Sequence, residues 1–182
     1  MQSSETEHAI VRTFASEVVP GKSPLSVWCL PVAGAAERDC FGIVERQIAK
    51  AGGSLVLGWA IWYRVPIIEA EFHAVWQSRS GVWLDLTPRP FAVEWITFVS
   101  DPAARYGGSQ VDNIRRSLVD DPVVDEFLAL QRRQFEIMNE GDLARAHGRI
   151  RLTEQRMAEL EFTSERASRL AELIAVRYQP PD

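Results

Sequence analysis

The sequence contains little cysteine and little histidine. Its 182 residues include three His and two Cys, Cys29 and Cys40. Two cysteines are too few for a disulfide framework, and neither belongs to the paired Cys/His spacing of a structural zinc site. We therefore expect two free thiols, no metal and no cofactor.

Long apolar runs are also absent. No stretch reaches the roughly 18 uninterrupted apolar residues that a membrane helix needs. The first eight residues have neither the positive start nor the apolar run of a signal peptide. These absences predict a cytoplasmic protein with no membrane partner.

The chain lacks an excess of positive charge. It has 20 Lys and Arg against 25 Asp and Glu, for a net charge of −5. Proteins that bind nucleic acids need basic surface to neutralise phosphates, so we expect no nucleic-acid partner. The glycine pairs at 52–53 and 107–108 lack the spacing and the Lys-Ser/Thr of a phosphate loop, and we interpret them as turns.

The composition that is present, 46% apolar and 25% charged, is typical of a soluble globular protein. It changes along the chain, because all six Trp and both Cys lie between Trp28 and Trp95, whereas Arg, Glu, Leu and Ala dominate beyond about residue 110. We predict an α+β domain over residues 1–110, followed by a helical extension over residues 111–182.

The first part predicts one helix followed by consecutive strands. In the segment 39–53, Asp39 can cap the first backbone amides and Gly52 can take the left-handed conformation that ends a helix. Cys40 then lies in the first turn. Extended segments are predicted at 13–19, 25–30, 55–63, 69–76, 82–88 and 93–99. This order predicts a mainly antiparallel sheet packed against the Cys-bearing helix, and a short helix is expected near residues 112–118.

The segments 69–76 and 82–88 read as a β-hairpin, because strand-forming residues flank a Ser/Arg/Gly turn. Side chains alternate across a strand, so His73 shares a face with Glu71, and Asp85 shares a face with Thr87. If these faces coincide, an imidazole and a carboxylate lie side by side. That pairing suits a base held by an orienting acid.

A cysteine at a helix start, then a strand with His and a strand with Asp, is the order of parts in a thiol nucleophile system. The helix N-terminus favours a thiolate, the imidazole accepts the thiol proton, and the carboxylate fixes the tautomer of the imidazole. Cys40, His73 and Asp85 are therefore the candidate catalytic residues. Each has a plainer interpretation, since a lone Cys is often a buried small hydrophobe and a lone His or Asp is often structural.

The segments around Cys40, from His73 to Trp76, and from Gly81 to Pro88 resemble the transglutaminase-like branch of the papain-like thiol enzymes. The resemblance covers about residues 36–100. It implies a papain/transglutaminase-like α+β fold with Cys40 as nucleophile, His73 as base and Asp85 as orienting acid. It also implies acyl transfer or hydrolysis at amide, peptide or glutamine side-chain bonds.

We assign Trp28, Trp62 and Glu71 to substrate binding. Trp28 is one candidate oxyanion donor, and the backbone amides near Cys40 are another. Trp62 belongs to an aromatic set that either lines a substrate cleft or fills the core.

The carboxylates on the two strands leave other roles open. Glu71 could supply the carboxylate for His73 in place of Asp85. Glu69, Glu71, His73 and Asp85 could together ligate a metal, but no second His lies nearby in the sequence and we expect no metal site.

The C-terminal part predicts two helices. Asp121 and Pro122 mark the start of the first, and Gly141-Asp142 mark its stop and a new cap. From Leu143 onward, apolar and small residues recur at steps of three and four, which is typical of a diluted coiled-coil seam. We predict an antiparallel helical hairpin that either packs on the first domain or binds a protein partner or a second copy as a homodimer.

Two functional hypotheses follow. The first is a thiol protease or amidase, a cysteine hydrolase or transferase that acts on an amide bond of a peptide or protein substrate through a thioester. The alternative is a non-catalytic α+β interaction module that binds a partner or self-associates through the helical hairpin.

Overall fold

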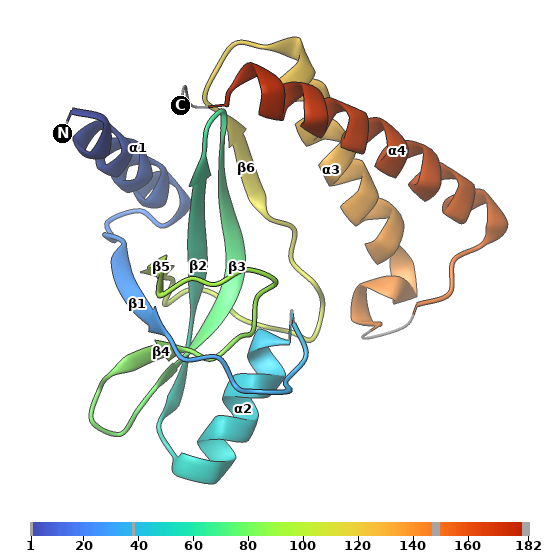
Figure 1. The fold of residues 1–182 in the computed structure, drawn as a ribbon. Helices are drawn as coiled ribbons and strands as arrows, with labels where there is room; N and C mark the ends of the chain where they lie inside the picture. The colour runs from blue at the N-terminus through green and yellow to red at the C-terminus, as the bar shows by residue number, and fades with distance from the viewer. Residues whose placement is uncertain (1, 38, 147–149, 180–182) are drawn as a thin grey trace. The chain divides into compact units, whose positions relative to one another are not determined.

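The computed structural model describes residues 2–37, 39–146 and 150–179, and it is an α+β protein (Figure 1). It divides into two compact units. The first contains residues 1–63 and 69–105, and the second contains residues 64–68 and 106–182. We describe each unit by itself.

Five strands of the first unit form a closed barrel. They are β1 (Leu25–Cys29), β2 (Ser54–Arg64), β3 (Ile67–Gln77), β4 (Trp83–Asp85) and β5 (Trp95–Ser100). Their order is β2-β5-β1-β4-β3, and β3 pairs with β2 to close the ring. The pairs β1/β5, β2/β5 and β3/β4 are antiparallel and the pair β1/β4 is parallel, so the sheet is mainly antiparallel as predicted, but its closure was not foreseen.

Apolar side chains of the strands form a buried cluster. Val27 of β1, Ala60 of β2, Val75 of β3 and Phe98 of β5 belong to it, and Trp83 of β4 meets Phe98 edge-on with ring centroids 6.1 Å apart. A closed sheet of few strands leaves an interior that side chains can fill. The barrel is therefore a packed core.

The helix α2 (Cys40–Ala51) carries Cys40 as its first residue. Its end matches the prediction, because Gly52 has φ 73° and its N–H donates to the carbonyl of Ile48 at 2.8 Å. The cap at the start of the helix differs from the prediction. The Asp39 side chain makes no capping hydrogen bond and pairs instead with Arg46, with Oδ2 2.8 Å from Nη2. The prediction that Asp39 caps this helix is wrong because a cation almost two turns into the helix, Arg46, competes for its carboxylate.

The predictions at two other elements are wrong. Residues 13–19 were expected to be a strand, but they end the helix α1 (Gln2–Val18), in which Phe14 and Ala15 are buried. Residues 112–118 were expected to contain a short helix, but Ile114–Ser117 form β6. At residues 112–118 the tertiary context overrode a weak local preference.

The second unit contains α3 (Pro122–Asn139), the short 3-10 helix η1 (Gly141–Arg145) and α4 (Glu154–Arg177). As predicted, α3 starts at an Asp121 cap, whose side chain accepts from the Val123 amide at 2.9 Å. The second helix begins later than predicted, at Glu154, with Thr153 as its cap. Part of the expected seam, residues 147–149, lies outside the described residues.

Ion pairs join α3 to α4, which lie side by side in Figure 1. Glu126 pairs with Arg166 at 2.7 Å, Arg133 with Glu159 at 2.7 Å, and Glu140 with Arg156 at 2.7 Å. The pairs run in opposite order along the two helices. These side chains are largely exposed, so each pair stabilises the contact weakly.

Replacing Gly58 by Ala tests the tight packing of β2 against β5. A Cβ at Gly58 would lie 2.2 Å from the backbone oxygen of Val99, which cannot move without disturbing the pairing of the two strands. We expect Gly58→Ala to lower the free energy of unfolding by about 1–3 kcal/mol. Urea unfolding followed by Trp fluorescence measures it, because all six Trp lie in the first unit.

Gly107→Ala is the control for this measurement, because a Cβ at Gly107 would meet no atom within 4 Å. Equal stability of the two variants would contradict the described contact between β2 and β5.

Candidate functional site

The β3/β4 hairpin brings His73 and Asp85 together. The register pairs Trp76 with Leu84, so Asp85 faces Val75 across the ladder and lies on the same side as His73. The imidazole Nε2 of His73 is 2.9 Å from Oδ1 of Asp85. Since an ionised carboxylate only accepts hydrogen bonds, Nε2 carries the proton and donates. The two side chains are 1% and 0% exposed.

Asp85 is held in its charged form. Besides His73, its carboxylate accepts from the backbone amide of Thr87 at 3.0 Å and from Nη2 of Arg89 at 3.1 Å. Burial alone would raise the pKa of Asp85. The hydrogen bond and charge of His73, the charge of Arg89 and the Thr87 amide outweigh burial and lower this pKa to about 2.

The hydrogen bond between His73 and Asp85 also shifts the pKa of His73. Burial disfavours the charged imidazolium, but the hydrogen bond that His73 donates to Asp85, together with the Cys40 thiol, raises the pKa of His73 well above its ordinary value of 6.5. The second ring nitrogen, Nδ1, is buried and has no well-formed hydrogen bond to any described residue. Asp85 therefore holds one ring nitrogen of His73, Nε2, and leaves the other, Nδ1, available to accept a proton.

Cys40 lies near His73. Its thiol is one cause of the raised pKa of His73, yet it makes no well-formed hydrogen bond to Nδ1. Cys40 packs against Val44 of its own helix and against Ala74, the neighbour of His73 on β3. The positive end of the α2 dipole lies at this residue.

Arg89 completes the arrangement, and the sequence analysis missed it. Its guanidinium donates to Asp85, donates to Oε2 of Glu71 at 3.3 Å and stacks over the Trp62 ring at 4.6 Å. Trp62 in turn donates from Nε1 to the same Glu71 oxygen at 2.8 Å. A buried carboxylate needs a cation, so a buried Asp85 calls for a basic residue close by. Arg89 is the first basic residue after β4 along the chain, and this position was the available signal.

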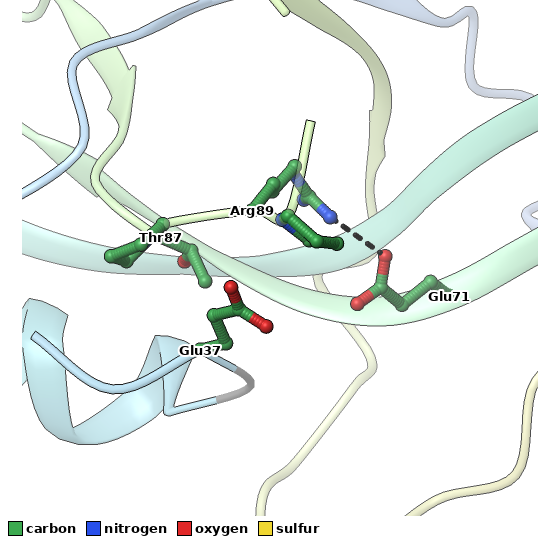
Figure 2. A pocket seen from close by; sticks show the side chains of 6 residues that line it. Glu37, Glu71, Thr87 and Arg89 are labelled. Carbon is green, nitrogen blue, oxygen red and sulfur yellow. Dashed lines mark hydrogen bonds and ion pairs between the residues drawn. The ribbon is translucent and has the colours of Figure 1, made fainter. Parts of the chain in front are cut away.

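Of the three residues assigned to substrate binding, Glu71 lines a pocket. This pocket has a volume of about 120 Å³ and is bounded by Glu37, Glu71, Thr87, Pro88, Arg89 and Pro90. Figure 2 shows Glu71 reaching toward Arg89 on one side of the hollow, with Glu37 opposite. Trp62 supports Arg89 and Glu71 without lining this pocket.

Trp28 is not part of this arrangement, which corrects its assignment as a substrate or oxyanion residue. Its neighbour Cys29 points to Asp85, with Sγ 4.0 Å from Oδ2, so Trp28 points to the other side of β1. Trp28 is 52% exposed and meets Trp95 edge-on at 5.6 Å.

The two cysteines have different environments. Burial, and then the charge of Asp85, raise the pKa of Cys29 to about 11. Cys29 is therefore a protonated thiol near neutral pH, and a thiol in that form is a poor nucleophile. Cys40 is the cysteine with an imidazole beside it.

Within residues 2–37, 39–146 and 150–179, no group of three or more His, Cys, Asp or Glu is arranged to hold a metal ion. Of the four residues considered as possible metal ligands, Glu69, Glu71, His73 and Asp85, both Asp85 and Glu71 are bound to Arg89. None of the helices in the same ranges is both long enough and apolar enough to span a bilayer.

Comparison with known proteins gives no significant match: neither a family model, nor a curated protein, nor a solved structure matches the chain. Any function must therefore be argued from the site itself.

Acidification tests the state of Asp85. Its pKa is about 2 in the folded protein and 3.8 without perturbation, so its contribution to stability is present above pH 3.8 and is lost as the pH falls through 2. We expect the difference in unfolding free energy between the wild type and Asp85→Asn to shrink by about 2 kcal/mol across this range. Urea unfolding at several pH values, followed by Trp fluorescence, measures it.

Glu45→Gln, on an exposed position of α2, is the matched control for loss of a carboxylate. A pH-independent difference for Asp85→Asn would contradict the ionised, paired state of Asp85.

Proposed function

We propose that this protein is a cysteine-dependent hydrolase or acyltransferase that acts on an amide bond of a peptide or protein through a thioester. The observation that carries the proposal is the buried His73–Asp85 hydrogen bond, which leaves Nδ1 of His73 unpaired, together with the packing of Cys40 against Ala74, the neighbour of His73 on β3. A thiol, an imidazole and an orienting carboxylate in this order make a nucleophile system.

The first half-reaction forms the thioester. The Cys40 thiol gives its proton to Nδ1 of His73, and the sulfur attacks the amide carbonyl carbon. Asp85 holds the Nε2–H and stabilises the imidazolium that forms. The tetrahedral intermediate collapses with cleavage of the C–N bond, and the leaving amine takes the proton from Nδ1.

The second half-reaction releases the acyl group. His73 accepts a proton from water or from an acceptor amine as that molecule attacks the thioester carbonyl, and the proton returns to the Cys40 sulfur as the C–S bond breaks. Water gives hydrolysis, as in a protease or amidase, and an amine gives transfer. The backbone N–H of Cys40 at the start of α2 is the proposed oxyanion donor, in place of Trp28.

A relationship to the papain/transglutaminase-like enzymes is part of this proposal. It is supported by a Cys-bearing helix packed on a mainly antiparallel sheet, with His and Asp on successive strands. We also propose a cytoplasmic location, because Cys29 and Cys40 are both free thiols and such thiols suit a reducing compartment.

A second candidate function, a non-catalytic interaction module, is favoured by one feature of α4. Phe162, Leu173 and Val176 are 69%, 53% and 79% exposed. They are spaced by nearly whole helical turns and so share one side of the helix. In this proposal α3 and α4 form an antiparallel helical hairpin, and the apolar stripe binds a protein partner or the same stripe of a second copy.

Alkylation of the two cysteines tests the enzyme proposal. We expect iodoacetamide near neutral pH to modify Cys40 faster than Cys29, because His73 can take the Cys40 proton whereas the pKa of Cys29 is raised to about 11. His73→Gln is expected to slow modification of Cys40 by at least about tenfold. Mass spectrometry of the folded protein gives both rates.

Cys40→Ala should abolish turnover of any amide substrate found by screening, while Cys29→Ala, the matched control, retains it. A Cys40 that reacts no faster than Cys29, or whose rate is independent of His73, would contradict the enzyme proposal and favour the interaction module.

A further inference from the structure

The pocket beside the triad is built by residues that neighbour the catalytic positions in sequence. Glu71 lies two residues before His73 on β3, Thr87 lies two residues after Asp85, and Glu37 lies three residues before Cys40. A group of the substrate that enters this pocket would thus be bound next to the reacting bond.

The pocket contains a buried polar atom without a partner. Thr87 is only 5% exposed, yet its hydroxyl oxygen makes no hydrogen bond with any residue in the described part of the chain. Buried hydroxyls are nearly always satisfied, so an orphan in a pocket wall indicates that something from outside completes it. Figure 2 shows the side chains of Thr87 and Glu37 near one another, with Glu71 on the other side of the hollow.

Besides Arg89, whose guanidinium donates, the charged groups of the pocket are two carboxylates, which accept hydrogen bonds. The Glu71 carboxylate uses Oε2 for Trp62 and Arg89, which leaves Oε1 for the pocket. Glu37 is exposed at the rim and contributes a second carboxylate. With the Thr87 hydroxyl, these make three acceptors, which is the number that the three N–H groups of a primary ammonium require.

The net charge of the pocket and its surroundings is negative, which suits a cationic group. Arg89 is the one cation among its six lining residues, and its guanidinium is already shared between Asp85 and Glu71. Glu37, Glu71 and Asp85 carry three negative charges, which exceed the charge of Arg89 together with that of a protonated His73. A cation placed here gains attraction, and an anion is repelled.

We propose that this pocket is the subsite that binds a primary ammonium group of the substrate, through Glu37, Glu71 and the Thr87 hydroxyl. The proposal rests on the proposed cysteine chemistry and gives it a substrate class, peptides with a positively charged amine close to the scissile amide. That amine is either the α-ammonium of a peptide N-terminus or the side chain of a lysine.

Thiol-directed peptide probes test the proposal without a known substrate. Three chloromethyl ketones are compared: alanyl-alanyl with a free amino terminus, its N-acetyl form, and N-acetyl-lysyl-alanyl. The Cys40 sulfur displaces chloride from the methylene carbon, and His73 takes the thiol proton. The second-order rate of Cys40 labelling is measured by mass spectrometry for each probe.

We expect one cationic probe to label Cys40 about fivefold faster than the neutral N-acetyl-alanyl-alanyl probe, as suits a partly exposed ion pair. A faster free amino terminus identifies the α-ammonium, and a faster lysyl probe identifies the side chain. Glu37→Gln should reduce this rate ratio to near one. Glu45→Gln, which removes the same charge from an exposed position of α2 outside the pocket, should leave the ratio unchanged.

Three results would overturn the subsite. They are equal labelling by all three probes, a preference for the neutral probe, or a cationic preference that Glu37→Gln does not reduce. In each of these cases selective, His73-dependent labelling of Cys40 by the neutral probe would leave the cysteine chemistry standing. Failure of every probe to label Cys40 ahead of Cys29 would instead overturn the proposed function, and the subsite with it.

Discussion

The hydrogen bond between Nε2 of His73 and the Asp85 carboxylate is the interaction on which the candidate site depends. Both side chains are almost fully buried, where an uncompensated charge would be very costly. The protein meets this cost with the Thr87 amide and the Arg89 guanidinium, which bind the remaining carboxylate positions. Arg89 is itself held by Glu71 and Trp62. The ionised Asp85 therefore organises a network that reaches from the imidazole to the edge of the pocket.

Closure of the barrel explains why these groups meet. The parallel pair β1/β4 brings Cys29 next to Asp85, and the antiparallel pair β3/β4 brings His73 to the same carboxylate. The buried apolar cluster fixes the strands behind them. As a result the imidazole is held in one orientation, and its Nδ1 has no hydrogen-bond partner among the described residues. A base held in this way suits the proposed nucleophile system.

The sequence predicted those features that depend on local periodicity. The two-residue alternation along the hairpin placed His73 and Asp85 on one face, and a turn signal fixed which strands pair. The sequence did not predict the features that depend on closure of the barrel. Trp28 was misassigned because its direction follows from the β1/β4 pairing, which no local pattern reveals. Arg89 was missed because its role follows from the burial of Asp85. Residues 13–19 were misread as a strand although Phe14 and Ala15 match one face of a helix together with Val11 and Val18.

The most direct test of the account is the titration of His73 by NMR in the wild type and in Cys40→Ala. The central claim is that the thiol of Cys40 meets an imidazole already held by Asp85. It predicts a midpoint well above 6.5 in the wild type and a lower midpoint in Cys40→Ala, because the thiol contributes to the raised pKa of His73. In Cys29→Ala, the control, the midpoint should stay at the wild-type value. An identical His73 midpoint with and without the Cys40 thiol would show that the two groups do not interact, and would contradict the claim.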